Sequence, residues 1–340
     1  MRAPDFGRLE TLVGRAVRVT EMPGGASTRR YFRVDGVRGG TAVAMFVPEG
    51  GKPEEIAKEG ARSRWPFLEV RELLASHGVD VPALYHEDQE HGWLVLEDLG
   101  DDTLANFLAR NEPAREPLYR RAVEDLARAQ RALARLPADS IVATRAFDED
   151  LLRWEIDHFR EWGLEARGHV LSPEDRALFD AIAHRLAARI ASWPRGFVHR
   201  DYQSRNLMVR DRGASLCWID FQDALLGPRV YDLVALLNDS YQTFQRDFVE
   251  ARLREYAVAA GAEDITTIVE QFDYVTVQRK LKDAGRFVFI DRKKGNDSFL
   301  RFVEPTITKV ESALVRLSAH DPDMEALRDL LRRCLQSGGV

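Results

Sequence analysis

The pattern of apolar and polar positions divides the chain into a strand-rich part and a helix-rich part. Between residues 15 and 50, short runs rich in β-branched and aromatic residues alternate with glycine-bearing turns, which predicts three strands. Residues 52–78 have helical spacing, with Pro66 at the start of their second half. The runs PALYHED and GWLVLEDLG predict two further strands joined around Gly92. Residues 1–98 are therefore expected to form a small antiparallel-sheet lobe.

Helical spacing dominates residues 99–340, which are expected to form a larger, mainly helical lobe. After the polar connector NEPAREPL, apolar residues recur every three or four positions from Leu118 onward. Further along, Ser172 stands at a predicted N-cap, with Pro173 at the first helical position and Asp175 at the capping-box position. Two short β-type runs, GFVH and SLCWIDF, interrupt the helical part and flank a polar loop. The pattern predicts an α+β protein with two lobes.

Composition narrows the class of protein. Of the 340 residues, 45% are apolar and 31% are charged, as in an ordinary soluble globular protein. The formal net charge of −6 disfavours a nucleic-acid partner, and no apolar run approaches the ~20 residues that a membrane span requires. The N-terminus has no apolar signal segment, and the two cysteines lie far apart, outside any CxxC pattern. These features predict a cytoplasmic protein.

The polar loop carries the chemistry. In the stretch FVHRDYQSRNLMV, a His-Arg-Asp triplet ends at Asp201, and Asn206 follows five positions later. Asp220 comes 14 residues after Asn206, at the end of an apolar run in WIDFQDA. This order matches the kinase-type catalytic loop H-R-D-x-x-x-x-N followed by a strand that ends in a D-F pair. The pattern predicts phosphoryl transfer.

Phosphoryl transfer from ATP explains why these residue types stand together. A carboxylate must orient the attacking hydroxyl, and oxygen ligands must hold Mg²⁺ against the phosphates. Asp201 suits the first task, and Asn206 and Asp220 suit the second. The alternative is a β-turn in which Asp201 and Asn206 cap backbone groups while Asp220 forms a surface ion pair.

With these motifs in place, the sequence resembles the aminoglycoside phosphotransferase and choline kinase group of the protein-kinase-like superfamily. Within that group it looks most like the bacterial anomeric kinases of N-acetylmuramate and N-acetylglucosamine. The resemblance implies a bilobal fold with ATP and Mg²⁺ between the lobes. Residues 1–98 would cover the nucleotide, and residues 99–340 would carry the catalytic loop and the acceptor site. The acceptor would be an amino sugar phosphorylated at its C1 hydroxyl in cell-wall recycling. The segments that carry it, in family order, are STRRYFRV (27–34), LVLEDLGDDTL (94–104), HRDYQSRNLM (199–208), IDFQDALLGPRVYDLVALLNDSY (219–241) and QRKLKDAGRF (278–287).

The resemblance also implies roles for residues outside the polar loop. The backbone of Glu97, Asp98 and Leu99 would form the hinge that binds the adenine edge, although the stretch is also an ordinary strand end and turn. Asp232 would begin a helix and brace the catalytic loop, which is compatible with an ordinary carboxylate at a helix N-terminus. His199 is interpreted as a packed structural residue rather than a participant in the chemistry.

One position departs from the superfamily pattern. The third strand usually carries a lysine that binds the α- and β-phosphates, as in V-A-I-K, but here VAMF places Phe46 there. The cation could come from Arg30, which strand alternation places on the same face as Phe32 and Val34. It could also come from the segment beyond the strand, at Lys52 or Lys58. A third interpretation is an inactive nucleotide-binding protein, which the three retained oxygen ligands disfavour.

The glycine-bearing turn PGGASTRR lacks the G-x-G-x-x-G pattern, so by itself it predicts a hairpin turn. In this context, the small residues would allow backbone N–H groups to approach the phosphates. The nucleotide-binding residues predicted here are Gly25, Ser27 and Thr28, with Ala26 between them.

The link between the metal ligands and the next helix indicates a small acceptor. Only ten residues separate Asp220 from the helix expected near Tyr231, and no A-P-E motif follows. A protein kinase needs a longer segment there to bind a peptide.

One wall of the acceptor site is predicted on a helix within residues 271–289, where Gln278, Lys282 and Gly285 fall on one face. A small gap beside an amide and a cation would suit an acidic or acetamido sugar, and Arg279 is a further candidate there. The alternative is a solvated cationic face formed by Arg279, Lys280 and Lys282. The leading prediction is an amino-sugar kinase. The alternatives are a kinase of aminoglycosides or other small alcohols, and an inactive binding protein.

Overall fold

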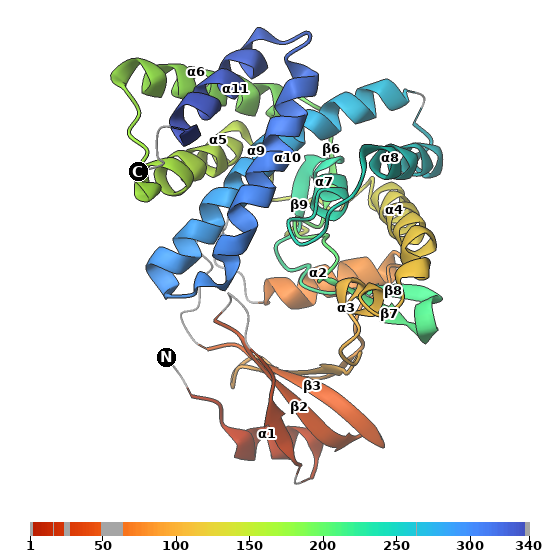
Figure 1. The fold of residues 1–340 in the computed structure, drawn as a ribbon. Coiled ribbons are helices and arrows are strands. Elements are labelled where there is room, and N and C mark those ends of the chain that lie inside the picture. The colour runs from red at the N-terminus through yellow and green to blue at the C-terminus, as the bar shows by residue number, and fades with distance from the viewer. Residues whose placement is uncertain (1–2, 16, 24–27, 49–63, 263, 337–340) are drawn as a thin grey trace. The chain divides into compact units, whose positions relative to one another are not determined.

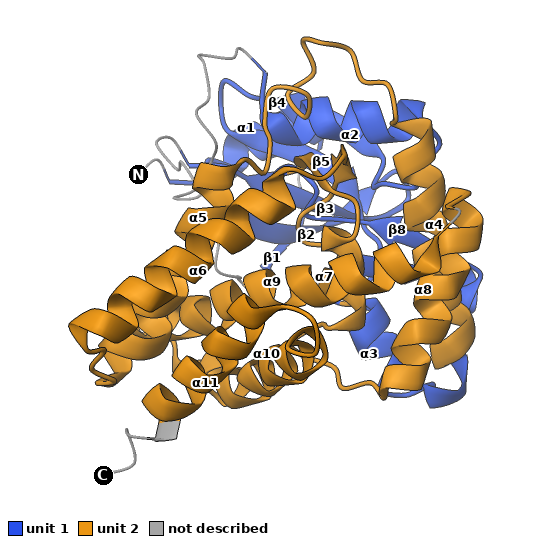
Figure 2. Ribbon diagram, turned by 90° about the horizontal axis from the view of Figure 1, so that it is seen from above, with its two compact units in different colours: residues 1–114, 205–223 blue, residues 115–204, 224–340 orange. Residues whose placement is uncertain are grey.

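The computed structural model describes residues 3–15, 17–23, 28–48, 64–262 and 264–336. Within these ranges it shows strands mainly in the first third of the chain and helices in the rest (Figure 1). By compactness the chain divides into two units, shown in Figure 2. Unit 1 comprises residues 1–114 and 205–223, and unit 2 comprises residues 115–204 and 224–340. The predicted α+β fold is confirmed, while the predicted functional boundary at residue 98 stays a prediction.

Unit 1 contains an antiparallel sheet of five strands in the order β1-β2-β3-β5-β4. The register places Phe32 opposite Ala44, and Ala44 opposite Val95. Residues of alternate positions therefore share a face, as strand geometry requires. The five predicted strands are confirmed with these bounds: β1 Val19–Glu21, β2 Arg30–Val37, β3 Gly40–Phe46, β4 Leu84–Asp88 and β5 Trp93–Glu97.

Helix α1 (Phe6–Val13) covers one face of this sheet. It begins at Asp5, whose carboxylate accepts the N–H of Arg8, and it ends at Gly14 in the left-handed conformation. Leu9 from the helix is buried with the apolar residues of β2, β3 and β5 that share this face. The buried cluster comprises Leu9, Phe32, Val34, Val37, Ala42, Ala44, Phe46, Trp93 and Val95.

Elsewhere in unit 1, the described residues form two short α-helices and a hairpin. Helix α2 (Pro66–Ser76) has Pro66 at its first turn, as predicted, and α3 spans Leu104–Leu108. Strands β7 (Leu207–Arg210) and β8 (Ser215–Trp218) pair in an antiparallel hairpin. The sequence pattern predicted β8 but not β7.

Unit 2 is mainly helical. Ser172 caps helix α6 by accepting the N–H of Asp175, which confirms the predicted cap. Strands β6 (Arg195–Val198) and β9 (Leu225–Pro228) pair beside the polar loop, and β9 was not predicted. The helices are α4 Arg115–Ala132, α5 Glu149–His158, α6 Pro173–Ala191, α7 Tyr231–Leu237, α8 Arg246–Ala260, α9 Ile265–Lys294, α10 Val303–Leu317 and α11 Pro322–Gln336. No helix of the described residues is long and apolar enough to cross a membrane.

Candidate active site

The backbone of the His-Arg-Asp triplet is held in unit 2 by one buried carboxylate. Asp232, in the first turn of α7, is completely buried, and its two oxygens accept the N–H groups of His199 (2.6 Å) and Arg200 (2.9 Å). Burial raises the pKa of Asp232 to about 7, although both N–H groups act in the opposite direction. This arrangement fixes the backbone next to Asp201, which is the geometry that a bracing role requires.

Arg200 is held in an uncommon backbone conformation. Its φ is +79°, in the left-handed region that long side chains rarely adopt. The side chain of its neighbour His199 is completely buried and packs edge-on against Tyr202, with ring centroids 5.7 Å apart. Such strain of about 1–3 kcal/mol persists only where the surrounding contacts impose it, and it is common at functional sites.

Asp201 itself is accessible and lies in a positive environment. Its side chain is 34% exposed, and its Oδ1 lies 3.3 Å from Nη2 of Arg279, which donates from α9. Burial acts to raise the pKa of this carboxyl, but the charges of Arg279, Lys282 and Arg200 outweigh it and lower the pKa. Asp201 is therefore ionised throughout the neutral range and can accept a hydrogen bond from a hydroxyl.

We expect replacement of Arg279 by glutamine to move the acid limb of the pH–rate profile to higher pH. A lowered pKa keeps Asp201 ionised as the pH falls, so removal of the nearest cation raises that pKa and activity is lost at a higher pH. The measurement is kcat/KM against pH for the wild type and the variant. Arg292→Gln, at an exposed position near the end of the same helix, is the matched control. An acid limb at the same pH in Arg279→Gln and in the wild type would contradict the interpretation that this limb reports the ionisation of Asp201.

A buried network behind Asp201 was missed by the sequence analysis. Its centre is Glu155 of α5, which is completely buried. Glu155 lies 3.5 Å from the guanidinium of Arg200, accepts the amide of Gln278 at 2.8 Å and accepts the hydroxyl of Tyr231 at 3.3 Å. The signal was present in the sequence, because a charged residue at position 155 interrupts the apolar face of α5 between residues 152 and 156.

The cations of α9 are not a solvated face. Arg279, Lys280 and Lys282 are buried, with exposed fractions of 2%, 1% and 7%. Arg279 donates to the carbonyl of Arg200 at 2.7 Å, and Lys280 forms an ion pair with Asp283 at 2.8 Å. The solvated alternative is therefore wrong, because partners from distant segments and from the helix itself cover these charges.

The predicted gap beside Gly285 is also wrong. A Cβ atom at Gly285 would lie 2.8 Å from the carbonyl oxygen of His158 and 2.8 Å from Cα of Phe159. Glycine is required because the backbone at the end of α5 and the start of the π-helical segment Phe159–Leu164 packs directly against α9. The space expected for a sugar is thus occupied by backbone, and Gln278 binds Glu155. The roles of Gln278, Arg279 and Lys282 toward an acceptor stay predictions.

Unit 1 places the two predicted metal ligands at the open end of one hairpin. The N–H of Ile219 donates to the carbonyl of Asn206 at 3.0 Å and continues the β7–β8 pairing, so that Asn206 and Asp220 flank the same end. The amide of Gln222 donates to both Asp220 and Asp223 at 3.0 Å. Asp220 is 45% exposed, with a left-handed φ of +63°.

This set of oxygen donors fits Mg²⁺. Carboxylate and amide oxygens are hard ligands, and Mg²⁺ is usually held by one or two carboxylates together with phosphate oxygens. Within the described ranges, no group of three or more His, Cys, Asp or Glu side chains forms a metal site. The amide of Asn206 and the nucleotide would therefore complete the coordination that Asp220 begins.

The other predicted nucleotide-binding residues belong to unit 1. Asp98 is held by Arg33, whose Nε and Nη2 donate to it at 2.7 and 3.1 Å, and the N–H of Glu97 donates to the carbonyl of Ala83. Arg30 pairs with Glu21 at 2.8 Å. Thr28 is exposed. The roles of these residues and of Leu99 stay predictions; Gly25, Ser27, Lys52 and Lys58 lie outside the described residues.

The division into units separates the three central residues. Asp201 belongs to unit 2, and Asn206 and Asp220 belong to unit 1, because the boundary falls between residues 204 and 205. Their meeting around one magnesium-bound triphosphate stays a prediction.

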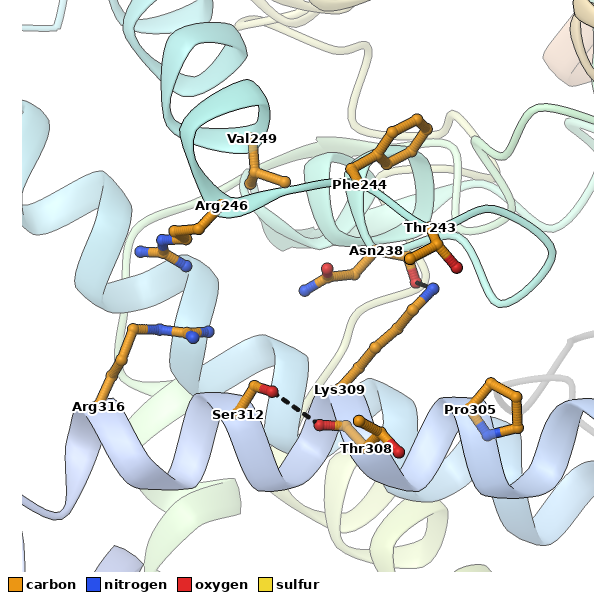
Figure 3. Close-up of a pocket in the computed structure, with 10 residues that line it drawn as sticks. All are labelled: Asn238, Thr243, Phe244, Arg246, Val249, Pro305, Thr308, Lys309, Ser312 and Arg316. Atoms are coloured by element: carbon orange, nitrogen blue, oxygen red, sulfur yellow. Dashed lines mark hydrogen bonds between the residues drawn. The ribbon is translucent and has the colours of Figure 1, made fainter.

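Unit 2 also contains a cavity of about 310 Å³, between α8, α10 and the loop that follows α7 (Figure 3). Arg246 and Arg316 on its wall both bind the carboxylate of Asp273. Lys309 donates to backbone carbonyls of the loop, including that of residue 242 at 2.6 Å. These cations are compensated by the protein, and the lining residues that the structure describes include none of the predicted site residues.

A family model for the phosphotransferase enzyme family matches residues 18–265. That is more than two thirds of the chain and includes the polar loop, Asp220 and Asp232. The chain belongs to the phosphotransferase enzyme family. The predicted enzyme class, a kinase that phosphorylates a hydroxyl group, is thereby confirmed.

Two related proteins are named as kinases and are similar to this chain over most of its length. An N-acetylmuramate/N-acetylglucosamine kinase of Pseudomonas aeruginosa is 33% identical over 313 residues, covering 90% of this chain and 85% of its own. A kinase of the same name from Neisseria meningitidis is 32% identical, with 90% and 87% covered.

Two solved structures share the fold. A choline kinase from Streptococcus pneumoniae has a TM-score of 0.62 at 17% identity, covering 90% of this chain and 97% of its own. The GDP complex of an aminoglycoside 2'-phosphotransferase has a TM-score of 0.60 at 14% identity, with 92% and 98% covered. The predicted kinase-like fold is confirmed.

Proposed function

We propose that this phosphotransferase transfers the γ-phosphoryl group of ATP to an amino sugar, N-acetylmuramate or N-acetylglucosamine, and that the C1 hydroxyl is the acceptor. The observation that carries the proposal is the pair of named kinases that are 32–33% identical over nine tenths of this chain. The ionised, partly exposed Asp201 supports it, because a hydroxyl needs such a carboxylate to be oriented for in-line attack.

Each residue has a defined task in the proposed reaction. The sugar hydroxyl donates a hydrogen bond to Asp201 and attacks the γ-phosphorus, the bond to the β-phosphate oxygen breaks, and ADP leaves. The hydroxyl proton passes to Asp201 and then to solvent. Asp232 and the Glu155 network keep Asp201 in place during these steps. Mg²⁺, when held by Asn206 and Asp220, would neutralise charge on the β- and γ-phosphates.

The positive surroundings of Asp201 favour an acceptor with an acidic substituent. Arg279 and Lys282 both act on this carboxylate, and both are buried side chains whose charges are poorly screened. N-acetylmuramate carries a carboxylate and N-acetylglucosamine does not. We expect the acidic sugar to have the lower KM, with similar kcat for the two.

The test is a coupled assay of ADP formation with both amino sugars, choline and kanamycin as acceptors, at saturating ATP and Mg²⁺. Turnover with the amino sugars and none with choline or kanamycin would support the proposal. A ³¹P NMR spectrum of the product, with coupling of phosphorus to the anomeric proton, would establish the C1 position. Phosphorylation of kanamycin or choline in place of the sugars would refute the proposed substrate class.

A further inference from the structure

The usual position for the phosphate-binding lysine faces the core of the sheet in this protein. Phe46 is 1% exposed and lies in the cluster covered by α1, with its ring 5.0 Å from that of Trp93. The register pairs Phe46 with Arg30, so the two residues share this face. A residue at position 46 therefore has no access to a phosphate, and a cation must come from elsewhere.

Arg29 lies beside a predicted metal ligand. Its Nη1 is 3.6 Å from Oδ1 of Asp220, and its side chain is only 15% exposed. Tyr31 shares a hydrogen bond with Arg29, and the charge of Asp223 also acts on this guanidinium. Arg29 directly precedes β2, so that it and Arg30 point to opposite sides of the extended chain.

This contact contributes little as a structural ion pair. The separation of 3.6 Å exceeds hydrogen-bond distance, and Asp220 is nearly half exposed, so the direct contact is weaker than a hydrogen-bonded ion pair. A guanidinium carries five N–H donors in a rigid fork, so one side chain can face a carboxylate and also bind phosphate oxygens. Its burial strengthens such a contact, because water screens it less.

We propose that Arg29 binds the β- and γ-phosphates of the nucleotide next to Asp220, in place of the missing strand lysine. The inference rests on the proposed function, since it takes ATP as the phosphoryl donor. A phosphate-binding role for Arg29 also explains why charges of both signs lie together at this site. Asp220 and Asp223 attract the cation Mg²⁺, and Arg29 beside them compensates the triphosphate.

The experiment measures nucleotide binding directly, by calorimetry with the full chain, Mg²⁺ and no sugar. We expect Arg29→Ala to weaken ATP and ADP binding by about ten- to a hundredfold, the range for loss of a charge-assisted hydrogen bond. AMP, which has neither phosphate, should bind to the variant and the wild type equally. Arg29→Lys should recover part of the loss, because it restores the charge without the fork. Arg18→Ala, at an exposed arginine of the same unit, is the control.

Two further variants, Arg29→Gln and Arg30→Ala, control for unfolding and test the neighbouring arginine. Arg29→Gln keeps most of the side-chain length without the charge and replaces the alanine variant if thermal melting shows that variant to be unfolded. Unchanged ATP affinity in folded Arg29 variants would overturn the inference alone, as would a loss of affinity in Arg30→Ala instead. Failure of the wild-type chain to bind ATP would overturn the proposed function and the inference together.

Discussion

Replacement of Asp201 by asparagine should lower kcat by about 10²- to 10⁴-fold, the range for loss of a general base. Asparagine has the same shape and keeps an oxygen that faces Arg279, but it does not accept the proton of the sugar hydroxyl. The affinity for ATP should change less than threefold, because Asp201 has no proposed contact with the nucleotide. The measurement is steady-state kinetics with saturating amino sugar, together with the Kd for ATP.

Asp247→Asn is the matched control for this variant. Asp247 is an exposed aspartate in the first turn of α8, in the same unit as Asp201. The Asp247→Asn variant should retain wild-type kinetics. A wild-type rate in Asp201→Asn would show that another group orients the hydroxyl, and the assignment of the polar loop would be wrong.

The largest effect on stability is expected for Asp232→Ala. This change leaves the N–H groups of His199 and Arg200 without their acceptor in a buried site. Each buried donor without a partner costs about 1–3 kcal/mol, so the free energy of unfolding should fall by about 2–6 kcal/mol. The measurement is urea denaturation, and kcat should fall too because the backbone next to Asp201 is no longer fixed. A loss below about 0.5 kcal/mol, the usual range for a neutral surface site, would rule out the bracing role.

The same variant should remove a pH dependence with a definite sign. The folded-state pKa of Asp232, about 7, is higher than the value of about 3.9 for an unfolded chain, so the folded state binds more protons between these limits. The free energy of unfolding therefore falls as the pH rises from about 4 to 7. The difference in stability between the wild type and Asp232→Ala should shrink over that interval. A difference that grows with pH would indicate that the carboxylate is ionised throughout, held by the two N–H groups.

Local patterns were sufficient to predict much of the fold. The five strands of the large sheet in unit 1 and the capped start of α6 depend on alternation, turn residues and N-cap chemistry, all of which lie within a few residues. Strand β9 was missed because it ends in Gly227 and Pro228, residues that sequence rules assign to turns, and β7 because its few apolar residues directly follow the polar loop. Their pairing is decided by partners elsewhere in the chain.

The site was predicted less completely, for the same reason. Helical spacing correctly put Gln278, Lys282 and Gly285 together, but it did not show that the backbone after α5 fills the space beside Gly285. Strand alternation correctly put Arg30 with Phe32, yet the identity of the covered face depends on α1 and Trp93. Burial of a charge such as Arg279 likewise depends on groups from distant segments.

The left-handed backbone at Arg200 and Asp220 has a consequence for engineering and evolution. Glycine adopts this conformation at no steric cost, so selection for thermostability alone would favour glycine at the half-exposed Asp220 and would remove a proposed metal ligand. At Arg200 the same change would leave the buried Glu155 without its guanidinium, so the relief of strain is outweighed there. Heat-resistant variants from a screen without an activity assay should therefore include inactive ones with glycine at position 220. A chain that keeps charged residues against their own conformational preference indicates that their side chains are used.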